Sequence, residues 1–402
     1  MHDAPGDVAP RAQTGPVATA APGHPARNQW VDVVRGLAIV GVVLVHSSLD
    51  GAKYVTEAGL VFNEDAKNLL SLGRYGVEVF FFISGWLLAS IYGSGGSLAG
   101  RGYWAKRIVR ILPLWVFFLG TVIAQGYLFP ENPGAWGNVL AVQDELGGSA
   151  LIPLLAVVMT LTFTLWLSPD WWNTIIGGGW SIQAEIAHYV IFPIIRRLRL
   201  AIALGALVVV NLVTFVGIQV SDSLPAGLHG LFEGWVRLGV FSTLSYFLLG
   251  CAVHFIATEL RDKPASAVLE TLAGIRGLWL VPVYAVTILL LPLPAGDNSA
   301  AISIVVLAAV CGFVLMRVTP ARVALVVVGR YSYFIYFAHF IVLELGGLLV
   351  PGLIGGIGSS TLASVVGVLF LFSLVWIVTV PLGWLSFRYF EGPFIRLARR
   401  AR

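Results

Sequence analysis

Ten long apolar stretches restrict this chain to one fold class. Each is about as long as a helix that crosses a bilayer, which needs roughly 20 apolar residues. They lie near residues 31–49, 68–92, 103–129, 178–197, 200–220, 234–257, 277–293, 299–317, 323–349 and 361–387. Charged residues make up only 11% of the 402 residues, against roughly 25% in soluble domains. The sequence therefore predicts an all-α integral membrane protein, a bundle of about ten transmembrane helices.

The positions of Lys and Arg predict which side of the membrane each loop faces. Basic residues concentrate in alternate loops, and cytoplasmic loops carry such an excess. This alternation holds only if an eleventh apolar segment, 150–167, does not cross, so we expect a re-entrant or interfacial segment on the outer side. Both termini are then cytoplasmic. We expect a disordered tail at 1–29, a transmembrane domain at 30–396 and a basic tail at 397–402. The net charge of +4 follows from these loops, so we expect a lipid bilayer and no nucleic acid as partner.

The first apolar stretch carries an arginine and a histidine on one helix face. Arg35 and His46 are eleven residues apart, which at about 100° per residue aligns them within roughly 20° and about 16 Å apart along the axis. A charge inside a bilayer costs roughly 2.5–3.5 kcal/mol, so it usually faces a bundle interior or a wet cavity and has a function. The spacing alone leaves two interpretations open. The two residues form a functional pair, or they mark the two edges of the span.

Glu78 and a later polar stripe are further candidates. Glu78 follows Arg74 by four residues, so the two can neutralise each other along a helix. Glu78 also opens a bulky apolar run that ends in a small Ser-Gly pair, which permits close approach of a helix or ligand. Ser181, Glu185 and His188 fall at i, i+4 and i+7 and share one face. That stripe could orient a hydroxylated substrate or could be a helix start with satisfied polar groups.

A basic and aromatic loop precedes the third stretch. Its cations and rings are Arg101, Tyr103, Trp104, Lys106, Arg107 and Arg110. Such a loop is ordinary for the cytoplasmic side of a membrane protein. It also suits a polyanionic cofactor, with arginine forks for phosphates and an aromatic ring for a nucleobase. Both interpretations stay open.

His339 lies deep in an aromatic stretch, where a buried histidine bonded to a neighbour is the commoner explanation. The sequence holds no convincing zinc spacing, so no metal is expected. It also lacks a phosphate-binding Gly loop, a nucleophile elbow and a dinucleotide fingerprint.

Taken in order, these stretches resemble the acyltransferase 3 family of bacterial membrane acyltransferases. The matching motifs are Arg35-x10-His46, Gly76–Gly85, Arg107–Pro113, Trp180-Ser181-x3-Glu185, Ser332-Tyr333-x2-Tyr336-x2-His339 and Glu391-Gly392-Pro393. The resemblance runs from about Trp30 to Arg396. The chain departs from the family pattern at Ile186, where a second Glu is frequent, and at His188, where an aromatic is common.

The resemblance implies transfer of an acyl group, most often acetyl, from cytoplasmic acyl-CoA to a hydroxyl of a glycan, a glycolipid or a secondary metabolite. It implies a multi-pass protein of the bacterial plasma membrane. On this basis we expect His46 to act as the general base that takes the proton of the attacking hydroxyl. We expect Glu78 to orient its ring, and Arg35 to hold acyl-CoA or stabilise oxyanion charge.

The resemblance also suggests which residues bind the two substrates. The expected contacts to acyl-CoA phosphates are Arg101, Arg107 and Arg110. The expected contacts to the acceptor are Trp180, Ser181, Glu185, His188 and His339. The alternative function is a multi-pass exporter or flippase of a glycan or small molecule, with the buried charges lining its pathway. The sequence shows no internal repeat of the kind that transporters carry, and the basic and aromatic loop has no role in that alternative.

Overall fold

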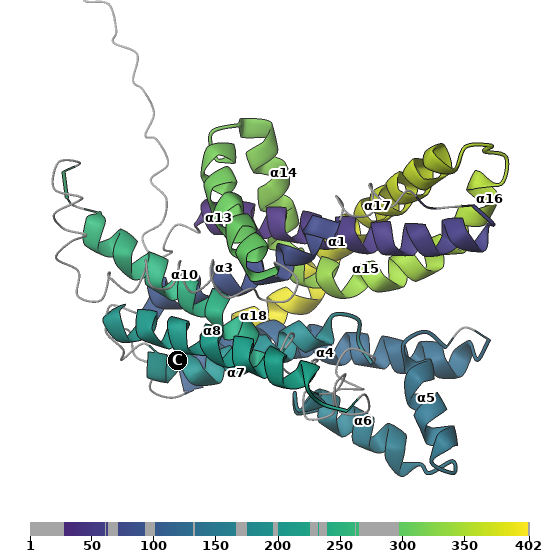
Figure 1. The fold of residues 1–402 in the computed structure, drawn as a ribbon, viewed down its shortest axis with the longest axis horizontal. Helices are drawn as coiled ribbons and strands as arrows, with labels where there is room; N and C mark the ends of the chain where they lie inside the picture. The colour runs from purple at the N-terminus through teal and green to yellow at the C-terminus, as the bar shows by residue number, and fades with distance from the viewer. Residues whose placement is uncertain are drawn as a thin grey trace, which may run out of the picture.

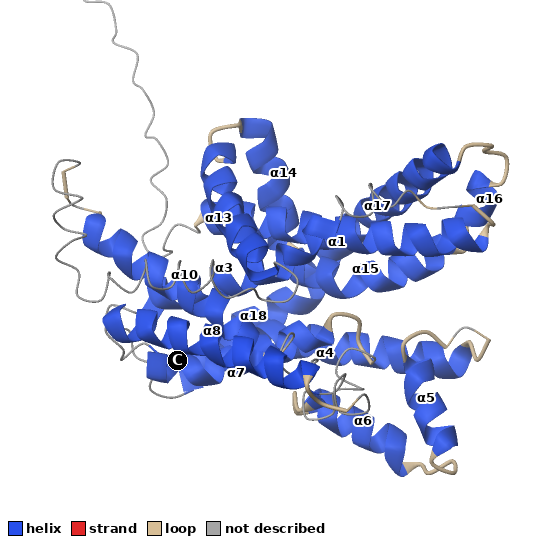
Figure 2. Ribbon diagram, in the orientation of Figure 1, coloured by secondary structure: helices blue, strands red, loops and turns tan. Residues whose placement is uncertain are grey.

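The computed structural model describes residues 28–60, 62, 71–92, 101–131, 133–165, 175–195, 200–225, 232, 239–261, 263–264 and 297–400. The elements in this part of the chain are helices, and no strand occurs among them (Figure 2). In chain order they are α1 (Gln29–Glu57), η1 (Ser71–Tyr75), α3 (Gly76–Tyr92), α4 (Arg101–Leu128), α5 (Trp136–Glu145), α6 (Leu151–Leu161), α7 (Gly179–Ile195), α8 (Leu200–Asp222), α10 (Val240–Leu260), α13 (Asp297–Leu315), α14 (Thr319–Arg330), α15 (Ser332–Gly347), α16 (Val350–Ile354), α17 (Ser360–Leu385), the π-helix η4 (Ser386–Glu391) and α18 (Gly392–Arg400).

The described elements are helical and include helices long enough to span a membrane, as predicted, but the expected ten spans are not confirmed. Among the described residues, five helices are long and apolar enough to cross a bilayer, and a broken pair makes six. The five are Gln29–Glu57, Gly73–Tyr92, Gly102–Leu128, Ser242–Leu260 and Ser360–Leu397. The expected span at 178–197 is the 17-residue helix α7, which is shorter than a typical span. The expected span at 277–293 lies outside the described residues.

One expected span, 323–349, is wrong as a single helix. The structure has two helices there, α14 and α15, bent by 77°. The break falls at Tyr331, whose φ of −97° and ψ of 9° are not helical. Gly329, two residues earlier, lies against the backbone of α1, where an added Cβ would come within 1.8 Å of the Asp32 carbonyl oxygen. The end of α14 is therefore pressed onto α1, and the chain turns there to run alongside it.

The segment expected not to cross contains α6. Its 11 residues rise about 16 Å, well short of the roughly 30 Å of a bilayer core. The buried Trp115 ring of α4 donates a hydrogen bond from Nε1 to the Thr160 carbonyl at 2.8 Å, which ties α6 to α4. Figure 1 shows α5 and α6 as a hairpin that projects from one end of α4. Helix α6 is too short to cross a bilayer alone, and a re-entrant or interfacial position for 150–167 stays a prediction.

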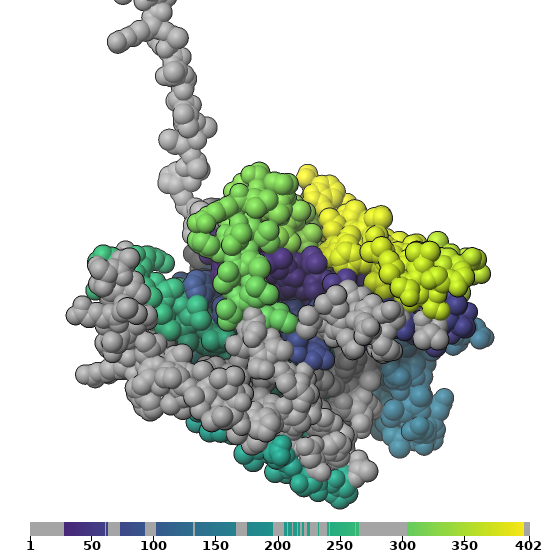
Figure 3. Space-filling model, turned by 45° about the horizontal axis from the view of Figure 1, so that its top comes forward, coloured from purple at the N-terminus to yellow at the C-terminus, as the bar shows by residue number. Residues whose placement is uncertain are grey.

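Helix α1 is the centre of the molecule. It contacts α3, α13, α14, α15, α16 and α17 (Figure 1), and in Figure 3 its purple atoms show between α13 and α14 on one side and the yellow C-terminal helices on the other. Val33, Ile39 and Val43 of this helix have no exposed surface. Residues of α1 on several faces are therefore held by neighbours, which fixes the position of Arg35 and His46.

The small Ser-Gly pair of α3 makes the close helix contact that its sequence permits. A Cβ on Gly85 would lie 2.0 Å from the Phe247 carbonyl oxygen of α10, and a Cβ on Gly250 would lie equally close to the Phe82 carbonyl of α3. The two glycines therefore let the backbones of α3 and α10 touch. Ser84, the residue before Gly85, bonds to Glu185 of α7.

Candidate active site

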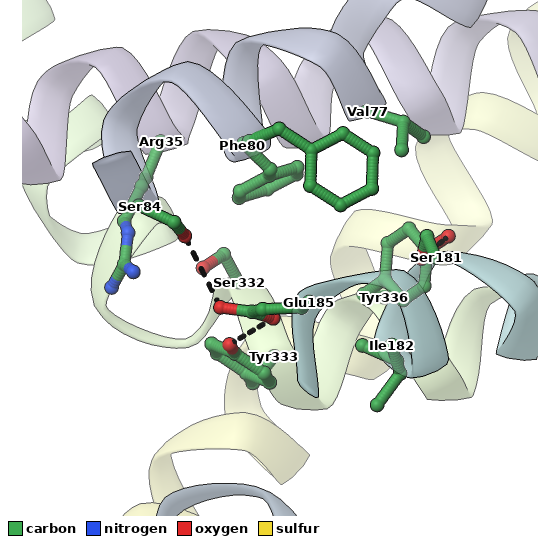
Figure 4. Close-up of a pocket in the computed structure, with 11 residues that line it drawn as sticks. Arg35, Val77, Phe80, Ser84, Ser181, Ile182, Glu185, Ser332, Tyr333 and Tyr336 are labelled. Carbon is green, nitrogen blue, oxygen red and sulfur yellow. Dashed lines mark hydrogen bonds between the residues drawn. The ribbon is translucent and has the colours of Figure 1, made fainter. Parts of the chain in front are cut away.

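A pocket lies between α1, α3, α7 and α15 (Figure 4). Its empty space, part of it open to the surface, is about 420 Å³. The lining residues are Arg35, Val77, Phe80, Phe81, Ser84, Ser181, Ile182, Glu185, Ser332, Tyr333 and Tyr336. Three of the residues selected from the sequence, Arg35, Ser181 and Glu185, thus meet in one place although they are far apart in the chain.

The carboxylate of Glu185 is the polar centre of the pocket. Ser84 donates its hydroxyl hydrogen to Oε1 at 3.1 Å, and Tyr333 donates to Oε2 at 2.6 Å (Figure 4). Tyr189, one turn later on α7, also donates to Oε1. Glu185 is 7% exposed, so these three hydroxyls replace water around its oxygens. They fix the carboxylate in one orientation.

Three arginines lie over the rings of the two tyrosines that donate to this carboxylate. The guanidinium carbon of Arg110 is 4.7 Å from the Tyr333 ring centroid, and that of Arg35 is 6.0 Å from the same centroid. Arg107 lies 5.3 Å from the ring centroid of Tyr189. Both tyrosines donate to Glu185, so the cations and the carboxylate form one connected group. Cation–π contacts of this kind hold a guanidinium without using its N–H donors.

Several donors in this group lack a protein partner. The Nε atoms of Arg35 and Arg107 are buried without a hydrogen bond, as is the hydroxyl of Ser332. A buried donor left unsatisfied costs about 1–3 kcal/mol, more when it is charged. Three cations near one carboxylate, with free donors on Arg35 and Arg107, suit an anionic ligand. The described residues offer no group of three His, Cys, Asp or Glu side chains that could hold a metal ion.

Ser181 and Tyr336 form a second hydroxyl pair on the pocket wall. Their oxygens are 2.8 Å apart, and each lies within 3.1 Å of the Gly178 carbonyl oxygen. Gly178 has a φ of +70°, and a Cβ there would come within 2.6 Å of the Tyr336 hydroxyl. The glycine before α7 therefore turns its carbonyl toward both hydroxyls.

His46 lies close to the pocket but does not line it. Its ring packs against Phe340 at 4.6 Å and against His339 at 5.2 Å between ring centroids. The His339 ring is in turn 5.8 Å from the ring of Tyr336, a pocket residue. Two side chains of α15 thus connect the pocket to His46. His46 faces α15, and its role as general base stays a prediction.

One ring nitrogen of His339 has a hydrogen-bond partner, and the other has none. Its Nδ1 lies 3.1 Å from the Ile335 carbonyl oxygen, so Nδ1 carries the hydrogen of a neutral ring. Its Nε2 is then a hydrogen-bond acceptor, and it is buried without a partner.

The remaining expected residues lie at various distances from the pocket. His188 is fully buried, stacked on Phe247 and bonded to the Thr243 hydroxyl at 3.2 Å, and it touches the pocket residue Phe81. The Trp180 ring also lies beside Phe81, at 6.4 Å.

Glu78 and Arg101 each begin a helix. Glu78 is in the first turn of α3, close enough to Tyr336 to act on it electrostatically. Arg101 is the first residue of α4, and its side chain lies outside the described part of the chain.

Sequence reasoning missed the hydroxyl groups that hold Glu185. Tyr189 follows Glu185 by four residues, and this spacing was a usable signal for a contact on one helix face. Ser84 and Tyr333 gave no such signal, because they come from other helices and meet Glu185 only in the folded chain.

Comparison with known proteins identifies the family. The profile of the acyltransferase 3 family, described as an acyltransferase domain, matches residues 28–384. The chain is 28% identical to the acyltransferase MdmB of Streptomyces mycarofaciens over 358 residues, which are 83% of this chain and 84% of that protein. It is 22% identical over 387 residues to a putative O-acetyltransferase of Staphylococcus aureus (strain COL). The aligned region covers 86% of this chain but 56% of that protein. It is 23% identical over 221 residues to the O-acetyltransferase OatA of Staphylococcus aureus, 52% of this chain and 34% of that protein. No solved structure matches. A match over most of the chain, with relatives that are acyltransferases, shows that this protein is a membrane acyltransferase of the acyltransferase 3 family.

Proposed function

We propose that the protein moves an acyl group, most often acetyl, from acyl-CoA to a hydroxyl of a glycan, a glycolipid or a small molecule. The observation that carries this proposal is the group of buried arginines with unpaired donors beside the pocket. Acyl-CoA is a polyanion with three phosphate groups, and arginine forks bind phosphates through paired N–H donors. We also propose that the protein lies in the bacterial plasma membrane with both termini in the cytoplasm, as the distribution of Lys and Arg predicts.

Each arginine has a proposed place along the donor. Arg107 and Arg110 lie in the first turns of α4, at the end that the basic loop places in the cytoplasm, and bind the phosphates. Arg35 lines the pocket, where it holds the donor. The three hydroxyls that already satisfy Glu185 keep this carboxylate from pairing fully with the cations. The site therefore keeps positive charge for the donor.

His46 takes the proton of the acceptor hydroxyl. As the proton leaves, the hydroxyl oxygen attacks the thioester carbonyl carbon and a C–O bond forms. The C–S bond then breaks, the thiolate of CoA takes the proton from the imidazole, and the acyl ester is released. Such a positioned base contributes typically 10²–10⁴-fold to the rate. Figure 4 shows Tyr336 on the pocket wall, and His339 next to it reaches the His46 ring. To reach His46 from the pocket, the acyl end of the donor has to pass Tyr336 and His339.

The test is release of CoA by purified protein in lipid nanodiscs, with mass spectrometry of the acceptor. We expect the wild type to release CoA and add an acyl mass, and His46→Gln to lower kcat by at least about 100-fold. His254→Gln is the matched control, because His254 is a histidine of α10 that packs on Trp86 and plays no part in the site. An acceptor whose mass stays unchanged, but which the same protein moves across the membrane of proteoliposomes, would show an exporter instead. Equal turnover by His46→Gln would remove His46 from the mechanism.

A further inference from the structure

A line of polar side chains continues past His46 toward the other end of α1. His46, Asp50 and Tyr54 are spaced by four residues and share one face of the helix. His46 touches His339 of α15, and the Tyr54 hydroxyl donates to the Glu344 carbonyl of α15 at 3.3 Å. Asp50 lies between these two contacts, so it also faces α15.

Two acidic residues lie near this face, Asp50 of α1 and Glu344 of α15. Glu344 is held from a third helix, because Gln125 of α4 donates its amide to Oε1 at 3.2 Å. The carboxylates of Asp50 and Glu344 are close enough to act on each other electrostatically. Among the described residues, the cation that acts on Asp50 is Lys53, which is exposed and lies 5.0 Å from the Tyr54 ring centroid. Because Lys53 is exposed, its charge is screened by water, and a bound cation would stabilise this partly buried acidic pair.

A buried acceptor without a partner belongs to the same line. His339 has no exposed surface, and its Nε2 has no hydrogen bond. Its Nδ1 is held by the Ile335 carbonyl, one turn earlier on α15, so Nε2 lies at the ring edge turned away from that turn. Glu344 is the next carboxylate along α15. An unpartnered acceptor at 0% exposure costs about 1–3 kcal/mol, which an O–H or N–H donor of a ligand would relieve.

We propose that Asp50, Glu344 and His339 form the acceptor site, and that the acceptor carries a protonated amine near the hydroxyl that is acylated. An amino sugar is the chemical class that fits. Its ammonium group lies between the two carboxylates, and its hydroxyl donates to the histidines. This inference rests on the proposed function for the reaction, but the binding of the amine does not depend on turnover.

The test measures binding of two probes to the protein in nanodiscs without donor, by isothermal titration at about pH 6.5, where an amine is protonated. The probes are hexyl β-D-glucosaminide and hexyl β-D-glucoside, which differ only by an amine in place of a hydroxyl. We expect the wild type to bind the amine probe at least about tenfold more tightly, as a charge-assisted contact allows. Asp50→Asn and Glu344→Gln should each reduce this preference to less than about threefold, because each keeps the side chain's size but removes one negative charge.

The matched control is Glu57→Gln, which removes the same charge from an exposed residue of α1. It should keep the preference. Equal affinity of the wild type for both probes, or an unchanged preference in both variants, would overturn the proposal. If the preference is present but no acceptor releases CoA, the proposed reaction fails while the amine site stands.

Discussion

Arg107 offers the sharpest test of the donor site, because its loss affects binding and stability in different ways. It is 6% exposed, and three tyrosine ring centroids lie within 6.0 Å of its guanidinium carbon. Its Nε has no partner in the protein. Arg107→Met keeps the length of the side chain and removes its charge and donors.

The expected loss of binding follows from the donors that the arginine offers to a phosphate. A hydrogen bond to a charged group contributes about 1.5–3 kcal/mol, and each 1.4 kcal/mol is a factor of ten in affinity. Arg107→Met should therefore raise KM and Kd for acetyl-CoA by about 10- to 150-fold. CoA release as a function of acetyl-CoA concentration gives KM, and binding of CoA to the same nanodisc sample gives Kd.

Stability should change much less than binding. The variant loses cation–π contacts worth about 0.5–2 kcal/mol, but it also removes a buried charged donor without a partner, which costs about 1–3 kcal/mol. These two contributions nearly cancel, so we expect the unfolding free energy to change by about 1 kcal/mol or less. Arg317→Met is the control, since Arg317 is exposed on the Phe313 ring at 4.9 Å and should leave KM unchanged. An unchanged KM for Arg107→Met, or a loss of several kcal/mol of stability with the same KM, would show a structural role only.

Two further predictions concern stability. Glu185→Gln replaces one carboxylate oxygen by an N–H₂ group, which cannot accept a hydrogen bond from Tyr333, and it removes a negative charge near the arginines. The free energy of unfolding, measured in denaturant, should fall by about 3 kcal/mol. Wild-type stability of this variant would contradict the hydrogen bonds described for Glu185. Gly85→Ala places a Cβ 2.0 Å from the Phe247 carbonyl oxygen and should lower the unfolding free energy by about 1–3 kcal/mol. Gly120→Ala is its control, because no atom lies within 4 Å of that Cβ, and it should raise stability by about 0.5–1 kcal/mol. Similar melting temperatures for the two alanine variants would contradict the close packing of α3 on α10.

The sequence predicted what depends on local spacing. Helix periodicity placed Ser181 and Glu185 on one face, and both line the pocket. The same period placed His188 on that stripe, yet in the structure it lies among Phe81, Phe247 and Thr243. Helix periodicity predicts only that these side chains point in the same direction from the helix axis. Which of them borders a cavity depends on the helices that cover that face at each turn.

Local sequence patterns could not predict the contacts between segments that are far apart in the chain. The bend between α14 and α15 depends on Gly329 meeting the backbone of α1, and no apolar pattern records such a contact. The nearness of His46 and His339 is similar, because nearly 300 residues separate them in the chain. Each histidine could be selected alone, but the pair appears only once α1 and α15 lie side by side.

The bend at Tyr331 has an electrical consequence. In one continuous helix the peptide dipoles align along the whole span, so the partial charges of the helix lie only at its two termini, near the membrane surfaces. The break instead creates a new helix beginning at Ser332, whose first backbone amides have no side-chain cap. Helix starts of this kind carry about half a positive charge. Ser332 and Tyr333 line the pocket, so the positive end of the α15 dipole lies there, while the negative end of α14 lies at Arg330 on the other side of the bend.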